Sequence, residues 1–194
     1  NDQSRLESWL LSALGFVMAF SMFCLIIWGI AFPFKPRADV QMLTMHNFYY
    51  AQGVDSTGVP TKLMTLNCSV HMVMHNPATF FGIHVRSLPV NLLYSQITVA
   101  TGEQIKKFYQ PRKSFRNVTF GVAGTLVPLY GAGYTLPPVA GSEIRVPMTL
   151  TFVVSTRGNV IGKLVKTRHD LLVSCFFVIN PIFDETIQLN CAYR

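Results

Sequence analysis

The chain is 194 residues long, and half of its residues are hydrophobic while only 13% are charged. Soluble domains carry about 25% charged residues, and the mean hydropathy of +0.35 is correspondingly high. One uncharged run from Ser8 to Phe34 accounts for most of this excess, and the 160 residues after it suffice for one domain. The composition therefore excludes a wholly soluble protein, a multi-pass transporter, a coiled coil and a disordered chain.

The uncharged run could be a signal peptide, a buried core helix or a transmembrane anchor, and its length decides among these alternatives. A bilayer core needs about 20 apolar residues, whereas the apolar part of a signal peptide has roughly 7 to 15. Trp9 and Trp28 lie towards the two ends, where headgroups favour such rings, and Pro33 and Pro36 stop a helix. We therefore predict a single transmembrane helix over residues 8–34.

The charges beside this helix do not decide its orientation. Arg5 precedes it, whereas Lys35 and Arg37 follow it. The chain begins with Asn1-Asp2 and no methionine, so we expect further residues upstream, with residues 1–7 as the end of a cytosolic tail.

Two glycosylation sequons favour an extracytoplasmic domain. They are Asn67-Cys68-Ser69 and Asn117-Val118-Thr119. Each asparagine falls on the polar phase of its segment, so a glycan on Asn67 or Asn117 could reach solvent. Cys175 and Cys191, which could pair in an oxidising compartment, favour the same orientation.

Apolar and polar residues alternate after Arg37, which is the pattern of half-buried strands. Three regular rows run from Met64 to Met74, from Ile144 to Val154 and from Ile187 to Tyr193, and less regular candidates cover Val40–Tyr50, Val90–Ala100, Ser114–Ala123 and Leu171–Ile179. Turn residues separate these segments. About seven or eight short strands predict an all-β domain over residues 35–194, an antiparallel β-sandwich of immunoglobulin-like type.

Cys175 and Cys191 both lie on the apolar phase of their segments. Pairing them sets Ile179 opposite Ile187, and directly opposite residues have Cα atoms about 4.5 Å apart, within disulfide range. We predict this disulfide, with two buried free thiols as the alternative. Cys24 falls in the anchor, and Cys68 is interpreted as a small core residue.

The sequence offers little for catalysis or cofactor binding. Its carboxylates are scattered, and His71 and His75 share a strand face without a third ligand nearby, so a solvent-facing strand is favoured over a metal site. Gly131-Ala132-Gly133 lacks the further residues of a nucleotide loop and is read as a turn. We predict a protein that is not an enzyme and that has no catalytic, cofactor or metal site.

Five bases lie within eleven residues without an acid, and they form a predicted basic patch: Lys106, Lys107, Arg112, Lys113 and Arg116. After residue 34 the bases outnumber the acids by 15 to 7. Such a patch suits an acidic cell-wall polysaccharide or the headgroups of membrane lipids, and nucleic acid is not expected outside the cytosol. The alternative is that these charges protect an exposed edge strand from aggregation.

The predicted helix also carries a stripe of small residues, Ser12, Gly15 and Ala19. Such a stripe allows close packing against another membrane helix. We therefore predict it as the contact for a partner helix.

Several longer segments resemble a known family: TLNCSVHMVMHNPATFFGIHV, KKFYQPRKSFRNVTFGVAGTLVPLYGAGYTLPP and VPMTLTFVVSTRGNVIGKLV. Together they resemble the plant late embryogenesis abundant group 2 (LEA-2) proteins, which include the NDR1/HIN1-like proteins, and within them most closely the companions of cellulose synthase. The resemblance runs from the anchor to the C-terminal cysteine. The chain has Asn76-Pro77-Ala78 where the wider family often has Asn-Pro-Asn.

The resemblance implies a single-pass protein of the plasma membrane, reached through the Golgi and the secretory pathway, with a cytosolic N-terminus and an apoplastic LEA-2 β-sandwich. Companion proteins accompany the cellulose synthase complex and connect it to microtubules through a cytosolic tail, which this sequence does not contain. The expected role is that of a non-enzymatic accessory of cellulose synthesis, with cellulose synthase or another membrane complex as partner through the helix. The alternative is a defence- or stress-related protein whose apoplastic domain binds wall glycan or lipid.

Overall fold

The computed structural model describes residues 2–31, 35–136, 145–161, 165–180 and 186–194, and it divides into two compact units, Asn1–Lys35 and Pro36–Arg194. The first unit is one helix, α1 (Asp2–Ala31). Its segment Glu7–Gly29, of 23 residues, is long and apolar enough to cross a membrane. At 1.5 Å per residue this segment is about 34 Å long, which exceeds the roughly 30 Å of a bilayer core. Residues 32–34 of the predicted anchor lie outside the described residues.

The described residues of the second unit form strands and one short 3-10 helix. In chain order the elements are β1 (Arg37–Val54), β2 (Pro60–Asn76), β3 (Ile83–Ser87), β4 (Val90–Tyr94), β5 (Ile97–Gly102), β6 (Phe108–Gln110), β7 (Ser114–Pro128), η1 (Tyr130–Thr135), β8 (Val146–Ile161), β9 (Val165–Ile179), β10 (Thr186–Gln188) and β11 (Asn190–Tyr193).

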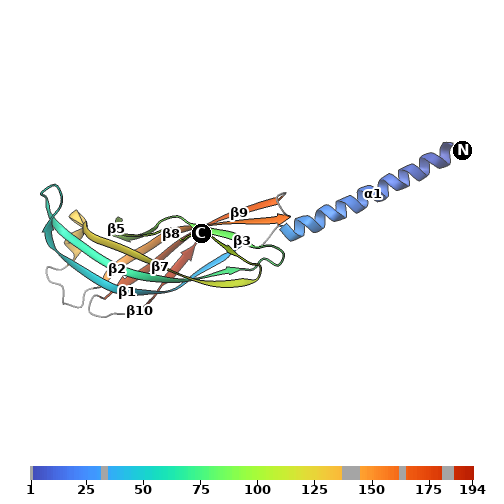
Figure 1. The fold of residues 1–194 in the computed structure, drawn as a ribbon. Coiled ribbons are helices and arrows are strands. Elements are labelled where there is room, and N and C mark those ends of the chain that lie inside the picture. The colour runs from blue at the N-terminus through green and yellow to red at the C-terminus, as the bar shows by residue number, and fades with distance from the viewer. Residues whose placement is uncertain (1, 32–34, 137–144, 162–164, 181–185) are drawn as a thin grey trace. The chain divides into compact units, whose positions relative to one another are not determined.

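All strand pairs in the described part of the domain are antiparallel, and one path of hydrogen bonds runs β10-β1-β2-β7-β5-β4-β8-β3-β6 (Figure 1). Strands β3 and β4 follow one another along one edge of β8, while β9 pairs along its other edge and carries β11. The short strands β4 and β5 thus connect a layer centred on β2 with a layer centred on β8. The predicted antiparallel β-sandwich is confirmed.

The core lies between these two layers because the inward residues of their central strands are apolar. On β2 the alternating residues from Met64 to Met74 are buried, as are those from Val146 to Val154 on β8. The rings of Phe120 and Phe152 meet edge to face with centroids 5.7 Å apart, which joins β7 to β8 across the core. The alternation read from the sequence therefore marks the inward faces correctly.

The structure has more strands than the sequence predicts, and its long strands β1, β2, β7 and β9 extend beyond their predicted ranges. The predicted strand Val90–Ala100 is two strands, β4 and β5, because Ser95 and Gln96 both adopt positive φ, at 45° and 73°. Consecutive positive φ values form the tight turn that suits the twist of a two-residue hairpin. Strands β3 and β6 were not predicted, since a strand of three to five residues leaves too few alternations to recognise.

The predicted row from Ile187 to Tyr193 is also two strands. Strand β10 pairs with β1, so Ile187 lies opposite Leu43, and the prediction that it faces Ile179 was wrong. Leu189 lies between the strands, and β11 then pairs with β9 on the other layer. One short C-terminal segment therefore covers the edges of both β1 and β9.

Candidate functional site

A hollow of about 480 Å³ opens on the outer surface of β3, β8 and β9. We call it the cationic cleft, because among the described residues its lining includes five bases and a histidine but no acid: His84, Arg86, Lys107, Arg157, Lys166 and Arg168. These side chains come from three strands and from the residue before β6.

Strand register brings these distant residues together. His84 of β3 lies opposite Arg157 of β8, and Arg157 lies opposite Arg168 of β9. On the far side of β3, the ring of Tyr109 lies 5.2 Å from that of His84. Residues directly opposite one another share a sheet face. The row therefore spans four neighbouring strands.

Among the described residues Asp170 is the acid that pairs with this row, and its charge is already engaged. Its carboxylate lies 3.0 Å from the Arg168 guanidinium and accepts a hydrogen bond from the Ser155 hydroxyl. The Ser155 bond and then Arg168 hold the pKa of Asp170 below its ordinary value, and Arg86 adds to the effect. Because Asp170 is exposed, this pair contributes little stability. The Asp170 carboxylate therefore neutralises only one of the surrounding cations, Arg168.

The five bases of the predicted basic patch are divided between two hollows and a turn. Lys107 lines both the cationic cleft and a neighbouring groove of about 850 Å³, which Lys106 and Arg116 also line. The Arg116 guanidinium lies 4.6 Å from the centre of the Phe108 ring, within range of a cation–π contact. Arg112 and Lys113 lie at the turn between β6 and β7, where the Lys113 backbone amide donates to the Ala78 carbonyl.

The second groove also holds both sequon asparagines, and both are exposed. The hydroxyl group of each sequon lies within hydrogen-bond distance of a histidine on the neighbouring strand. His46 Nε2 lies 2.7 Å from Ser69 Oγ, and His71 Nδ1 lies 3.0 Å from Thr119 Oγ1. This exposure permits glycans on Asn67 and Asn117, which stay a prediction.

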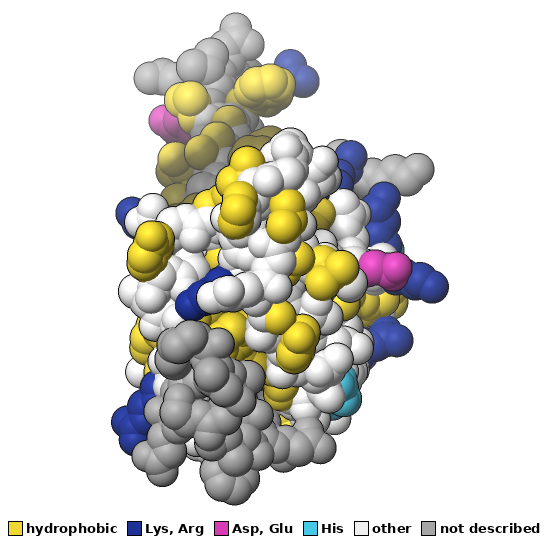
Figure 2. All heavy atoms as spheres, turned by 90° about the vertical axis from the view of Figure 1, so that its left-hand side faces the viewer, with side chains coloured by type: hydrophobic (Ala, Val, Ile, Leu, Met, Phe, Trp, Pro, Cys, Tyr) yellow, Lys and Arg dark blue, Asp and Glu magenta, His cyan; other side chains and the backbone are white. Residues whose placement is uncertain are grey.

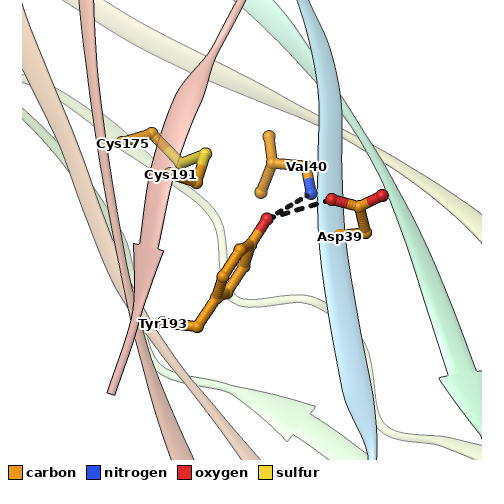
Figure 3. The surroundings of a disulfide bond; sticks show 5 residues. All are labelled: Asp39, Val40, Cys175, Cys191 and Tyr193. Carbon is orange, nitrogen blue, oxygen red and sulfur yellow. Dashed lines mark hydrogen bonds between the residues drawn. A yellow bond between two sulfur atoms is a disulfide. The ribbon is translucent and has the colours of Figure 1, made fainter.

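The structure joins Cys175 and Cys191 by the disulfide that the sequence predicts, with Cα atoms 4.0 Å apart (Figure 3). Two residues further along β11, the Tyr193 hydroxyl donates to the Asp39 carboxylate at 3.1 Å and accepts from the Val40 amide at 3.2 Å. These contacts attach β11 to β1, while the disulfide attaches it to β9. Cys68 is a buried free thiol, and burial raises its pKa to about 12.

Two buried side-chain amides, those of Asn76 and Gln110, lie in the segments that resemble the LEA-2 family, and they hold these segments together by hydrogen bonds. Asn76 donates to the carbonyls of Phe81 and Pro111, and its own oxygen accepts from the Ala78 amide. Gln110 is fully buried and donates to the carbonyls of Met74 and Ser114, each at 2.9 Å. These bonds join the segments before β3 and around β6 to the end of β2. Ala78, the third residue of the Asn76-Pro77-Ala78 segment, makes this hydrogen bond through its backbone amide. The bond therefore does not need the asparagine side chain that the wider family often has at this position.

Figure 2 shows the end of the domain where β1 turns into β2, with hydrophobic side chains in separate places and lysine and arginine mostly along the sides. At this turn Asp55 accepts hydrogen bonds from the Thr57 amide and hydroxyl, the Val59 amide and the Tyr130 hydroxyl. The hydrogen bonds from the Thr57 hydroxyl and the Val59 amide lower the pKa of Asp55 most, those from the Thr57 amide and the Tyr130 hydroxyl add to the effect, and the pKa falls to about 2. These bonds fix the turn against η1.

The remaining sequence candidates have ordinary structural contacts. The ring of His75 stacks on Phe115 at 4.1 Å, and among the described residues no three histidine, cysteine or acidic side chains lie close enough to hold a metal ion. Residues 131–133 belong to η1, a 3-10 helix where a turn was expected. The small residues Ser12, Gly15 and Ala19 are all exposed on α1, so their role in helix packing stays a prediction.

The sequence interpretation missed every residue of the cationic cleft except Lys107, that is His84, Arg86, Arg157, Lys166 and Arg168. A partial signal exists, because Lys166 and Arg168 are alternate residues of one strand and so share a face. The contribution of Arg86 and Arg157 depends on the register of β3 and β8, which are far apart in the chain.

The comparisons with known proteins agree with this architecture. The family model described as late embryogenesis abundant protein matches residues 72–175, from the end of β2 to the middle of β9. The chain is also similar to NDR1/HIN1-like protein 1 of Arabidopsis thaliana, with 28% identity over 162 residues that cover 80% of this chain and 71% of that protein. The family match covers more than half of the chain, and the chain belongs to the late embryogenesis abundant protein family that this model describes.

Proposed function

We propose that this protein is a non-enzymatic, single-pass membrane protein of NDR1/HIN1-like type whose β-sandwich lies outside the cytosol, at the plasma membrane. The observation that carries the proposal is the exposed apolar helix segment Glu7–Gly29, joined in one chain to a disulfide-bonded domain. Disulfides form and persist mainly in oxidising compartments. The similarity to NDR1/HIN1-like protein 1 supports the same assignment.

The orientation can be tested in sealed membrane vesicles from cells that express the full chain. Protease added outside right-side-out vesicles is expected to remove the β-sandwich, and endoglycosidase is expected to shift the mass of the wild type. The double variant Asn67→Gln, Asn117→Gln is the control for the glycan shift. If the β-sandwich is digested only after the vesicles are permeabilised, it lies in their cytosolic interior, and the proposed orientation is contradicted.

The finer proposal is that the protein acts as a companion of the cellulose synthase complex. Its support is the resemblance of the FYQPRKS and PLYGAG segments and the exposed small-residue stripe on α1. A photocrosslinking residue at Gly15 is expected to capture a cellulose synthase subunit in plant membranes. At 100° per residue, Val17 lies on the opposite side of the helix from the stripe and is the matched control position. Repeated capture of other proteins without the synthase would contradict this role.

The second candidate is a defence- or stress-related function in which the domain binds a ligand at the cell surface. The cationic cleft is the observation that favours it, because three of its cations face no described acid. If this candidate is right, loss of the protein alters a stress response while cellulose content stays unchanged.

A further inference from the structure

We propose that the cationic cleft binds an acidic polysaccharide whose charges are carboxylates. The inference deepens the proposed function and rests on it for the compartment in which the cleft meets its ligand. It assigns the contact to side chains of β3, β8 and β9, most of which lie outside the basic patch that the sequence suggested.

The charges of the cleft are incompletely balanced within the described protein. Asp170 engages Arg168 and lies near Arg86. Lys107, Arg157 and Lys166 form no ion pair with any described carboxylate. In addition, Nε of Arg86 is buried without a hydrogen-bond acceptor among the described residues. A buried donor without a partner is unfavourable, and the exposed cations that form no ion pair are open to an anionic ligand.

The arrangement suits an extended ligand better than a single small anion. The cations of the cleft come from β9, β8, β3 and the residue before β6, and neighbouring strands lie about 4.8 Å apart, so these cations spread over about 14 Å. Along β9, Lys166 and Arg168 are separated by two residues, or roughly 6.6 Å. A chain that carries one charge on each of several linked units can contact these cations in turn.

The compartment and the side-chain chemistry favour a carboxylated glycan over other polyanions. The proposed function assigns the domain to an oxidising compartment, which the disulfide supports, and nucleic acid is not an expected partner there. Anionic lipids are concentrated in the cytoplasmic leaflet, so they are the weaker candidate outside the cell. The planar guanidinium group of Arg157, which forms no ion pair with a described carboxylate, matches the two oxygens of a carboxylate.

The test uses the full chain in nanodiscs of neutral phosphatidylcholine, with binding measured by isothermal titration calorimetry. The probe is an oligogalacturonate of defined length, and its fully methyl-esterified form is the uncharged control with the same backbone. Binding is expected for the charged form only, and it should weaken as salt rises because the contacts are exposed.

Two variants with the same change in charge locate the binding site. Arg157→Gln with Lys166→Gln is expected to weaken binding roughly tenfold, since each exposed charge contact contributes up to about 1 kcal/mol. Lys106→Gln with Arg112→Gln removes two charges outside the cleft, and its affinity should stay within about twofold of the wild type. Far-UV circular dichroism establishes that both variants are folded.

Several outcomes would overturn the proposal: absence of binding, equal binding of the esterified probe, or equal weakening by both variants. Tighter binding to vesicles that contain phosphatidylserine, lost in the cleft variant, would reassign the cleft to lipid. The result of the binding experiment does not depend on how the protein is oriented in the cell membrane, because the domain is accessible on either side of a nanodisc. A cytosolic domain that binds the probe through the cleft would refute the proposed function alone.

Discussion

The disulfide between Cys175 and Cys191 allows the sharpest prediction of stability. Replacing both cysteines by alanine removes the cross-link between β9 and β11 while β9 keeps its long pairing with β8. Tyr193 then becomes the main side-chain attachment of β11 to β1, through its bonds to Asp39 and Val40. The substitution therefore tests how much the covalent bond adds to the closure of the domain.

The size of the effect follows from the length of the closed loop. The two cysteines are 16 residues apart in sequence, and a loop of about that length restricts the unfolded chain enough to stabilise the fold by about 3 kcal/mol. For a domain of this size, 3 kcal/mol corresponds to a fall in Tm of about 6 to 12 °C. Reduction of the wild type should lower the free energy of unfolding by a similar amount.

The assay is denaturant unfolding of the full chain in detergent, followed by circular dichroism in the β-sheet region. Tryptophan fluorescence is unsuitable because both tryptophans, Trp9 and Trp28, belong to α1. Cys68→Ala is the control, since Cys68 is as fully buried as Cys175 but is not bridged. If the bridged pair and this control lose the same free energy of unfolding, the argument from loop closure is refuted.

Three further predictions concern single side chains. Asn76→Ala is expected to destabilise the domain by about 2 to 4 kcal/mol in the same assay, because three buried hydrogen bonds lose their partner; a loss below 1 kcal/mol contradicts this. Because the folded pKa of Asp55 is lowered to about 2, its contribution to stability is complete above pH 4 and disappears as the pH falls towards 2. Asp55→Asn should therefore show a smaller loss of Tm over that interval than the wild type, and equal losses would refute the assignment. In a Cys24→Ala background, maleimide at pH 8 should leave Cys68 unmodified until denaturant is added, because its thiol is buried and its pKa is about 12; rapid labelling of the folded protein would contradict the buried placement.

Much of the fold can be predicted from the sequence because its long strands carry a strong local signal. Strand β2 alternates from Met64 to its end, so its buried face was identified correctly from Met64 to Met74. Short strands carry no such signal. The segment from Ile187 to Tyr193 reads as one alternating row, yet a break at Leu189 lets β10 and β11 pair with different layers.

The candidate site was harder to predict than the fold, because its residues meet only through long-range register. Arg157 and Arg86 lie on different strands far apart in the chain, and neither has basic neighbours in sequence to mark it. The dense run around Lys106 was conspicuous in sequence, but in three dimensions its members face different hollows. Density of charge along the chain is therefore a poor guide to density of charge on a β-sheet surface.

The position of β10 and β11 in the chain has a consequence for the biosynthesis of the protein. These strands follow the other described strands in the chain, and they cover the outer edges of β1 and β9. While the chain is being synthesised, both edges stay unpaired until the segment from Thr186 to Tyr193 has emerged. Exposed edges of long strands are sites of intermolecular pairing. The nascent domain is therefore most open to intermolecular pairing in the interval just before this segment is complete.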